Sequence, residues 1–155
     1  MPLGRKSKRK AGVIGLGTIG SNVAASLRHA GFQTFVWNRT PKASPNFLGS
    51  PAEVAEACDV IQLFVSDADA VTEMIEAMGP KLTTRHLVVC CGTIGLDGTM
   101  AAYRSVQGHG ASFLDAPFTG SKVASEKQQL VYYIGGEDEV LIRARPQLEL
   151  SLIHI

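Results

Sequence analysis

The hexapeptide GLGTIG, residues 15–20, has the residue types and the spacing that hold an anionic ligand through the backbone. It follows the short apolar run AGVIG and opens a stretch from Thr18 to Ala30 whose apolar residues recur at helical spacing. In a strand–loop–helix unit the first glycine permits a tight turn, the second lets the backbone approach a pyrophosphate, and the third lets the helix pack on the strand. The helix amino end adds free N–H groups and partial positive charge. The pattern predicts dinucleotide binding by Gly15, Leu16, Gly17, Thr18, Ile19 and Gly20; the alternative is a tight turn without a ligand.

The residues after the next expected strand, QTFVW at 33–37, indicate which dinucleotide is bound. An acid at this position would accept both ribose hydroxyls of NAD and would repel a 2′-phosphate. Asn38 removes that repulsion, and Arg39 offers a charged planar fork that suits a phosphate. Thr40 adds a hydroxyl, and Lys42 adds a second cation. We therefore expect NADP(H) as cofactor; the alternative for Arg39 is a solvated turn residue.

These residues need a sheet to bring them together, and the chain alternates strand-like and helical segments. The expected strands are 11–15, 33–37, 60–65, 87–91, 111–116 and 130–136, and the expected helices are 18–30, 50–58, 68–78, 96–107 and a charged helix from about 138. Such alternation predicts a single α/β domain, a doubly wound Rossmann-type fold with a mainly parallel sheet covered on both faces. The sequence SPAE, residues 50–53, has the form of a capping box in which Ser50 caps the helix and Glu53 reaches back to the cap.

Composition favours one globular domain with no metal and no membrane span. The chain has 155 residues, of which 45% are hydrophobic and 19% are charged, as in ordinary soluble domains. Its apolar runs are too short to cross a bilayer, and no secretory signal is visible. Three cysteines do not make a disulfide framework, and we expect the adjacent Cys90 and Cys91 to pack as small apolar groups. The scattered histidines lack the spacing of a metal site. These features together indicate a cytoplasmic protein.

Both ends of the chain carry atypical segments. Residues 5–10, RKSKRK, are almost all basic, and we expect residues 1–10 to form a disordered tail. Such an arm can contact nucleic acid, but no aromatic platform or groove-reading helix accompanies it, so we do not expect nucleic acid as a partner. The last six residues, LSLIHI at 150–155, match one reading frame of a common transposase sequencing adapter, and we expect them to be a non-native scar. The domain itself is then expected to cover 11–149.

Two long stretches of the sequence resemble a known enzyme family. The stretch 12–40, GVIGLGTIGSNVAASLRHAGFQTFVWNRT, is similar to the opening of the β-hydroxyacid dehydrogenases, which include 3-hydroxyisobutyrate dehydrogenases and glyoxylate/succinic semialdehyde reductases. The stretch 113–136, FLDAPFTGSKVASEKQQLVYYIGG, resembles the second signature of that family, and GTI at 92–94 resembles the segment near nicotinamide and substrate. The GSK at 120–122 is closer to the glyoxylate and succinic semialdehyde branch.

The resemblance implies roles for individual residues. It assigns the pyrophosphate to the loop 15–20 and the phosphorylated ribose to Asn38, Arg39 and Thr40. It implies that Val65 and Ser66 line the cofactor cleft and that Thr93 lies near the nicotinamide. It implies that a substrate carboxylate, from a small aldehyde or keto acid, binds to Thr119, Gly120 and Ser121. From the residues alone, the alternative for these last three is a turn that joins two strands.

The sequence departs from the family pattern in three places. The segment 41–49 is short and carries two prolines, so one crossover is abbreviated, and Gly92 stands where the family often has serine. The family's catalytic lysine belongs to a following all-helical domain, which we expect to be missing here; Lys122 and Lys127 do not match its motif. The resemblance also implies a homo-oligomer for the full-length protein, with contacts largely from that helical domain.

The leading hypothesis is the cofactor domain of an NADPH-dependent reductase of a small aldehyde or keto acid, inactive as this fragment. One alternative is an imine reductase, which has a similar cofactor domain and lacks the lysine. The other is a non-catalytic, nucleotide-dependent binding module whose basic tail contacts nucleic acid.

Overall fold

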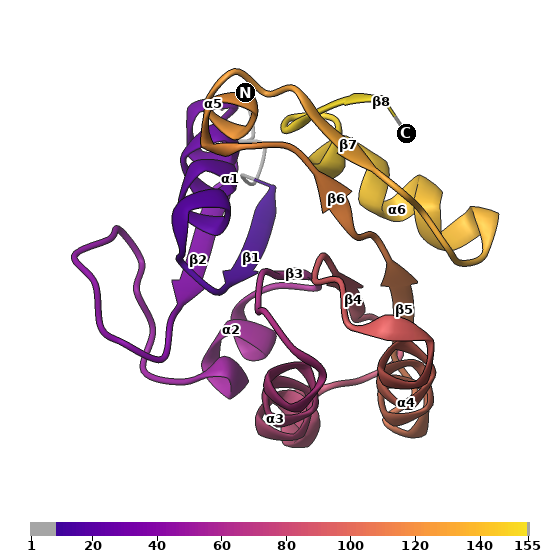
Figure 1. Ribbon diagram of the computed structural model, residues 1–155. Helices are drawn as coiled ribbons and strands as arrows, with labels where there is room; N and C mark the ends of the chain where they lie inside the picture. Colours follow the sequence, from indigo (N-terminus) through magenta and orange to yellow (C-terminus); the bar gives the residue numbers. More distant parts are fainter. Residues whose placement is uncertain (1–8, 155) are drawn as a thin grey trace, which may run out of the picture.

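A central parallel sheet organises the part of the chain that the structure, a computed structural model, describes, residues 9–154 (Figure 1). Its five strands lie in the order β2-β1-β3-β4-β5, and every neighbouring pair is parallel. The strands are β1 (Lys10–Ile14), β2 (Gln33–Trp37), β3 (Val60–Leu63), β4 (Leu87–Cys90) and β5 (Ser112–Asp115). Strands β3 and β4 are almost continuously buried, as expected for parallel strands covered on both faces.

The strand order places a topological switch point beside β1. The chain moves from β1 to β2 on one side and then crosses to β3 on the other. Beyond β2, Phe47 makes a parallel bridge to Val36, and the backbone hydrogen bond from Leu48 N–H to the Val36 carbonyl is 2.9 Å long. With this bridge counted as a rudimentary strand, the order matches the doubly wound dinucleotide-binding fold, whose ligand lies at the switch point. The predicted fold class is confirmed.

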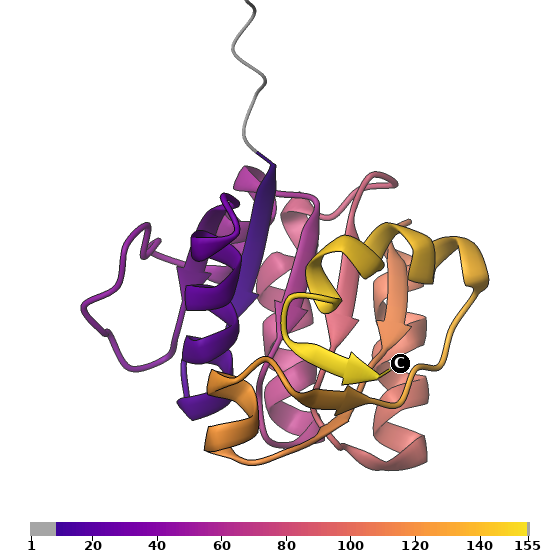
Figure 2. The same cartoon turned by 90° about the horizontal axis from the view of Figure 1, so that it is seen from above.

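Helices cover both faces of the sheet, and each face has its own hydrophobic core (Figures 1 and 2). One face carries α2 (Pro51–Ala57), α3 (Ala68–Met78), the 3₁₀ turn η1 (Gly79–Lys81) and α4 (Gly95–Gly108). The other face carries α1 (Thr18–His29), α6 (Asp138–Leu148) and a small second sheet. That sheet comprises β6 (Phe118–Thr119), β7 (Leu130–Tyr132) and β8 (Leu152–His154), with the short helix α5 (Lys122–Glu126) between its first two strands.

Two expected strands are shorter in the structure than their apolar runs suggested. Strand β3 ends at Leu63 rather than Val65, and the next carbonyl, that of Phe64, lies so close to Gly15 that a Cβ on Gly15 would be 2.1 Å from its oxygen. Strand β7 ends at Tyr132 rather than residue 136. Gly135 instead pairs with Asp115 through two backbone hydrogen bonds of 2.8 and 2.9 Å. Past the two strand ends, the Phe64 N–H still donates to the Ile14 carbonyl and the Tyr133 N–H to the Pro117 carbonyl, both at 2.8 Å, while Phe64, Val65 and Ile134 pack against the cores.

The predicted capping box at α2 is only half correct. The Ser50 hydroxyl accepts a 3.2 Å hydrogen bond from the Glu53 N–H, as an N-cap does. The Glu53 carboxylate, however, accepts from the N–H of Gly49, one residue before the cap. The Glu53 carboxylate thus receives the N–H that precedes the cap instead of the N–H of the cap itself.

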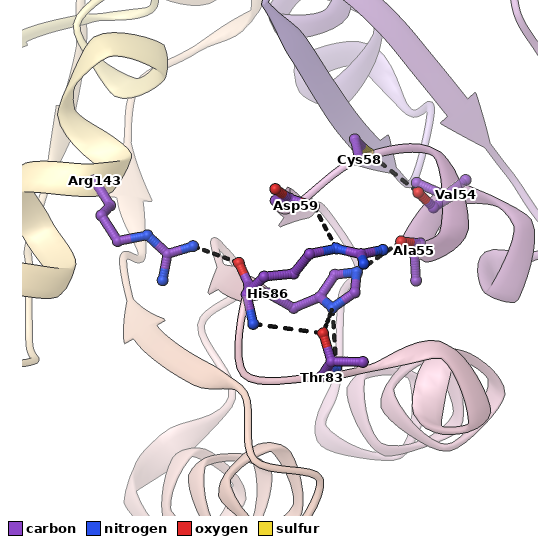
Figure 3. Close-up of polar contacts among 8 residues, drawn as sticks. Val54, Ala55, Cys58, Asp59, Thr83, His86 and Arg143 are labelled. Atoms are coloured by element: carbon purple, nitrogen blue, oxygen red, sulfur yellow. Dashed lines mark hydrogen bonds and ion pairs between the residues drawn. The ribbon is translucent and has the colours of Figure 1, made fainter.

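The amino ends of the strands are joined by a compact polar cluster (Figure 3). The buried His86 accepts a 3.0 Å hydrogen bond at Nδ1 from the Thr83 N–H. Because Nδ1 accepts, the proton lies on Nε2, which donates to the Ala55 carbonyl over 2.6 Å. Arg85 bonds to Asp59 at 2.9 Å and offers its carbonyl to Arg143. This cluster links α2, β4 and α6.

The two ends of the chain differ in part from expectation. Residues 1–8 of the expected basic tail lie outside the described residues, but Lys10 is already part of β1 and the Arg9 carbonyl accepts from the Gln33 N–H at 2.8 Å. At the other end, Leu152–His154 form β8, parallel to β7. The Ser151 hydroxyl lies 2.9 Å from the buried Tyr132 hydroxyl. Pairing in a strand does not test where residues 150–155 come from, and their foreign origin stays a prediction.

Candidate cofactor-binding site

The glycine-rich loop runs from β1 into α1 at the carboxyl edge of the sheet. Gly15 has φ +98°, which favours glycine. A Cβ on Gly20 would lie 1.9 Å from the Gly15 carbonyl oxygen, so this position must be glycine for the helix to approach the strand. A Cβ on Gly17 would meet nothing within 4 Å. Gly15 and Gly20 are therefore required by the fold itself, whereas Gly17 leaves open space for a ligand.

Two adjoining cavities flank this loop. One has a volume of about 330 Å³ and the other of about 370 Å³. Both are lined by Gly17, Phe64, Val65 and Ser66, so they meet beside the loop. Together they cross the carboxyl ends of β2, β1, β3 and β4, where ligands bind in open α/β sheets. This geometry suits an extended ligand whose middle lies at the start of α1.

Asn38 ties the loop to the end of β2. Its side-chain oxygen accepts a 2.8 Å hydrogen bond from the Leu16 N–H, and its side-chain nitrogen donates to the Thr40 carbonyl at 2.8 Å. The Leu16 carbonyl accepts from Ser21 Oγ at 2.9 Å and from the Lys42 ammonium. The Leu16 side chain is itself buried. Asn38 thus fixes the loop conformation as well as lining a cavity, a positioning role that sequence reasoning missed.

The larger of the two cavities contains the cofactor-selecting residues expected at the end of β2. Asn38 and Arg39 line it together with Trp37, whereas Thr40 does not. The Arg39 guanidinium forms an ion pair with Glu73 of α3. Further lining residues from the start of α3, which sequence reasoning also missed, are Asp67, Ala70 and Met74. Their helical spacing after the expected strand was the signal that could have located them.

The smaller cavity is bounded by the loops after β3 and β4. Ser66, Thr93 and Phe118 line it; that Ser66 lies in the cofactor cleft and Thr93 near the nicotinamide stays a prediction. A Cβ on Gly92 would lie 2.4 Å from the Val65 carbonyl oxygen, so the close approach of these two loops explains why glycine stands here. A third cavity, of about 240 Å³, shares Gly92 and Thr93 and extends past β5. Thr93 is therefore placed between two connected spaces.

The segment predicted to hold a substrate carboxylate lies beside these cavities without lining them. Pro117 and Phe118 line them, but Thr119, Gly120 and Ser121 do not. Thr119 belongs to β6, and Gly120 has φ +143°. Ser121 is the N-cap of α5, and its hydroxyl accepts from the Ala124 N–H at 3.3 Å. The alternative of a plain turn between two strands is wrong, because α5 intervenes; substrate binding here stays a prediction.

The cysteines behave as packing residues. All three are free and buried. Burial raises the pKa of the Cys58 thiol to about 12 and that of Cys90 to about 11, and it raises the pKa of Cys91 well above its ordinary value. Since the thiolate is the reactive form, these thiols are poor nucleophiles. Within residues 9–154, no group of three His, Cys, Asp or Glu side chains is arranged to hold a metal ion.

A fold with a glycine-rich loop at the switch point defines a pyridine-nucleotide-binding domain, and comparison with known proteins agrees. The model of the NAD binding domain of 6-phosphogluconate dehydrogenase matches residues 10–151. The chain belongs to this family. Some of its relatives are oxidoreductases of the β-hydroxyacid dehydrogenase type, and others are the cytokine-like nuclear factor N-PAC, which in Mus musculus is 30% identical over 135 residues, 83% of this chain and 24% of that protein.

Individual relatives cover nearly all of this chain but only part of their own length. Glyoxylate/succinic semialdehyde reductase 2 of Arabidopsis thaliana is 28% identical over 151 residues, which are 90% of this chain and 42% of the reductase. The structure of 3-hydroxyisobutyrate dehydrogenase from Mycobacterium tuberculosis, with L-serine, aligns with a TM-score of 0.89 at 24% identity, over 95% of this chain and 54% of that one. An imine reductase from Streptomyces aurantiacus aligns with a TM-score of 0.82 at 19% identity, over 94% and 54%. The chain thus spans about half the length of these proteins.

Proposed function

We propose that this chain is the cofactor-binding domain of an NADPH-dependent oxidoreductase that reduces a small, carboxylate-bearing aldehyde or keto acid. The observation that carries the proposal is the pair Asn38 and Arg39 in the 370 Å³ cavity beside the glycine-rich loop. An amide and a guanidinium at this place give a 2′-phosphate a neutral partner and a cationic one, where an NAD-selective chain presents a carboxylate.

The residues present fit such a cofactor. Gly17 leaves open space at the amino end of α1, whose N-cap makes no side-chain hydrogen bond. Free N–H groups and the helix dipole can therefore receive the pyrophosphate. Asn38 holds the Leu16 N–H and so fixes the loop before a ligand arrives. In the smaller cavity, Ser66 and Thr93 offer hydroxyls beside the apolar face of Phe118, a suitable surface for a nicotinamide ring.

When bound, the reduced nicotinamide supplies a hydride for the carbonyl carbon, and the carbonyl oxygen must then receive a proton. Among the described residues no lysine lines any of the three cavities. Lys122 is largely exposed and lies 3.9 Å from Glu126 of its own helix. A positioned acid contributes about 10²–10⁴-fold to such a step. We therefore propose that the chain as given binds the cofactor but shows no measurable turnover, and that a lysine from the family's helical domain supplies the proton.

Cofactor selectivity tests the core of the proposal. Isothermal titration should show NADPH binding more tightly than NADH by about 1–3 kcal/mol, the worth of charge-assisted hydrogen bonds. Changing Arg39 to Ala should remove most of that difference. Arg104→Ala, which removes an exposed arginine on α4, is the matched control and should leave it intact. Equal affinities in the unmodified chain would refute the assignment of NADPH.

The fold is also like that of imine reductases, so whether a carbonyl or an imine is reduced has to be determined with substrates. We propose the carbonyl, because Pro117 and Thr119 stand in the segment that resembles the β-hydroxyacid dehydrogenase signature. Supplying a downstream helical domain and comparing glyoxylate, succinic semialdehyde and a cyclic imine would decide. Turnover of the imine alone would favour the alternative. The three free cysteines suit a reducing compartment, and we propose the cytoplasm; no helix between residues 9 and 154 has the length and apolarity of a membrane span.

A further inference from the structure

Arg39, the cation proposed to select NADPH, already has an anionic partner in the structure. Its guanidinium pairs with the carboxylate of Glu73, which projects from the middle of α3. Both side chains are largely exposed, at 65% and 59%. Ala70 and Met74, on the same stretch of α3, line the cavity that Arg39 also lines. The ion pair therefore stands at the rim of the adenosine end of the cleft.

A second carboxylate near Arg39, that of Asp67, lines the cavity itself and is engaged differently. Asp67 is the N-cap of α3, and its Oδ1 accepts a 2.8 Å hydrogen bond from the Ala70 N–H. Its position is thus fixed by the helix, whereas Glu73 is directed to Arg39. Of the two, Glu73 is the carboxylate whose charge a ligand bound at Arg39 would meet directly.

A 2′-phosphate and a 2′-hydroxyl respond differently to this pair. The phosphate needs the same guanidinium N–H groups that Glu73 occupies, and its negative charge is repelled by the carboxylate at short range. A neutral ribose hydroxyl does not compete with Glu73 for the charge of the guanidinium, and the carboxylate does not repel it. Glu73 therefore opposes the binding of NADPH and leaves that of NADH nearly unaffected.

We propose that Glu73 is a positioning residue that sets cofactor specificity through Arg39, by holding the guanidinium and so limiting the preference for NADPH over NADH. This inference rests on the proposed function, because it assumes that the 2′-phosphate is received at Arg39. It predicts that the unmodified chain prefers NADPH over NADH moderately and that removal of the Glu73 carboxylate increases this preference.

The test is Glu73→Gln in the 155-residue chain, which keeps the size of the side chain and removes its charge. Affinities for NADPH and NADH, and for the fragments 2′,5′-ADP and 5′-AMP, are measured by titration calorimetry. NADPH and 2′,5′-ADP should bind about two- to five-fold more tightly than to the unmodified chain, the range of an exposed ion pair. NADH and 5′-AMP should be unchanged, and the gain should shrink at high salt.

Glu76→Gln is the matched control, since Glu76 is exposed on the same helix and pairs with no cation among residues 9–154. It changes the net charge equally and should alter neither cofactor. In an Arg39→Ala background, Glu73→Gln should lose its distinctive gain, because the residue through which it acts is gone.

The outcomes separate this inference from the proposal beneath it. If the unmodified chain prefers NADPH and Arg39→Ala abolishes the preference, but Glu73→Gln behaves like Glu76→Gln, the role of Glu73 is refuted and the proposed function stands. If the unmodified chain shows no preference and Glu73→Gln creates one, Glu73 masks Arg39 completely: the inference about Glu73 holds, while the assignment of NADPH to the unmodified chain fails. If neither variant nor parent distinguishes the cofactors, both ideas fail.

Discussion

The two edges of the sheet use polar residues in opposite ways. At the amino edge, His86 receives the Thr83 N–H and donates to the Ala55 carbonyl, so both ring nitrogens are satisfied within the protein (Figure 3). At the carboxyl edge, the N-cap of α1 is Gly17, which offers no side chain to the first N–H groups of the helix, and polar groups face open cavities. One edge stabilises the fold and the other is open to a ligand, so the same variant should not disturb both.

The largest effect that tests this difference is expected from Gly17→Val. A Cβ at Gly17 would meet nothing within 4 Å, and a branched side chain there would fill the space for a pyrophosphate. We expect the affinity for both NADPH and NADH to fall on the order of 100-fold or more, about 2.7 kcal/mol, with an unchanged circular dichroism spectrum. Gly108→Val, where a Cβ would also meet nothing within 4 Å, is the control distant from the loop.

A substitution at Gly20, one helical turn after Gly17, should lower the stability of the fold. Gly20→Ala would place a Cβ 1.9 Å from the Gly15 carbonyl oxygen, and relieving such overlap costs about 1–3 kcal/mol or more of folding stability.

Unaltered binding in Gly17→Val, with an intact fold, would show that the glycine-rich loop is only a turn.

The amino edge should respond in stability alone. His86→Leu leaves the Ala55 carbonyl, in a buried site, and the Thr83 N–H, in a partly buried one, without their partners. Each unsatisfied buried group costs about 1–3 kcal/mol, so we expect a loss of about 2–4 kcal/mol in the free energy of unfolding, measured with urea. His29→Leu, at an exposed position on α1, should change little. A weakened affinity for NADPH in the folded His86 variant would contradict the separation of the two edges.

The sequence predicted the carboxyl edge of the main sheet better than the second sheet, because the signals for that edge lie in neighbouring residues of the chain. The loop 15–20 and Asn38 follow strands whose apolar runs and flanking helices are readable from neighbouring residues. Phe118, which lines the smaller cavity, and α5, which inserts between β6 and β7, depend on contacts far apart in the chain, such as that of Asn22 with Ser125 at 2.8 Å. Such contacts leave no periodic signal.

The ion pair of Arg39 with Glu73 shows the same limit within the site itself. The residue type at 39 predicted a phosphate partner, but the partner in the structure comes from 34 residues further along the chain. The residue type at 39 and its position after a strand predicted a cation that binds an anion. The packing of α3 determines that this anion is Glu73 in the structure.

The smallest effect concerns Asp115, a carboxyl at the open edge that lies between two cavities. It lines both the 240 Å³ space beside Thr93 and a separate cavity of about 470 Å³ next to α4. Its Oδ1 is buried and has no hydrogen-bond partner among the described residues, and burial raises the pKa of the Asp115 carboxyl above its ordinary value of 3.8.

The folded state therefore holds the proton of Asp115 more tightly than the unfolded state does. Stability falls as the pH rises from the ordinary pKa through the raised one, and the full cost is present at neutral pH. Asp115→Asn, which cannot ionise, should stabilise the fold at pH 7 by roughly 0.5–1 kcal/mol, a small gain because the rest of the side chain is solvated. Urea unfolding at pH 7 and at pH 3 measures it, and the gain should vanish at the lower pH, where the parent carboxyl is protonated in both states. A variant that is less stable than the parent at pH 7 would show that the carboxylate has a partner in solution, and the carboxyl edge would then be as fully satisfied at Asp115 as the amino edge is at His86.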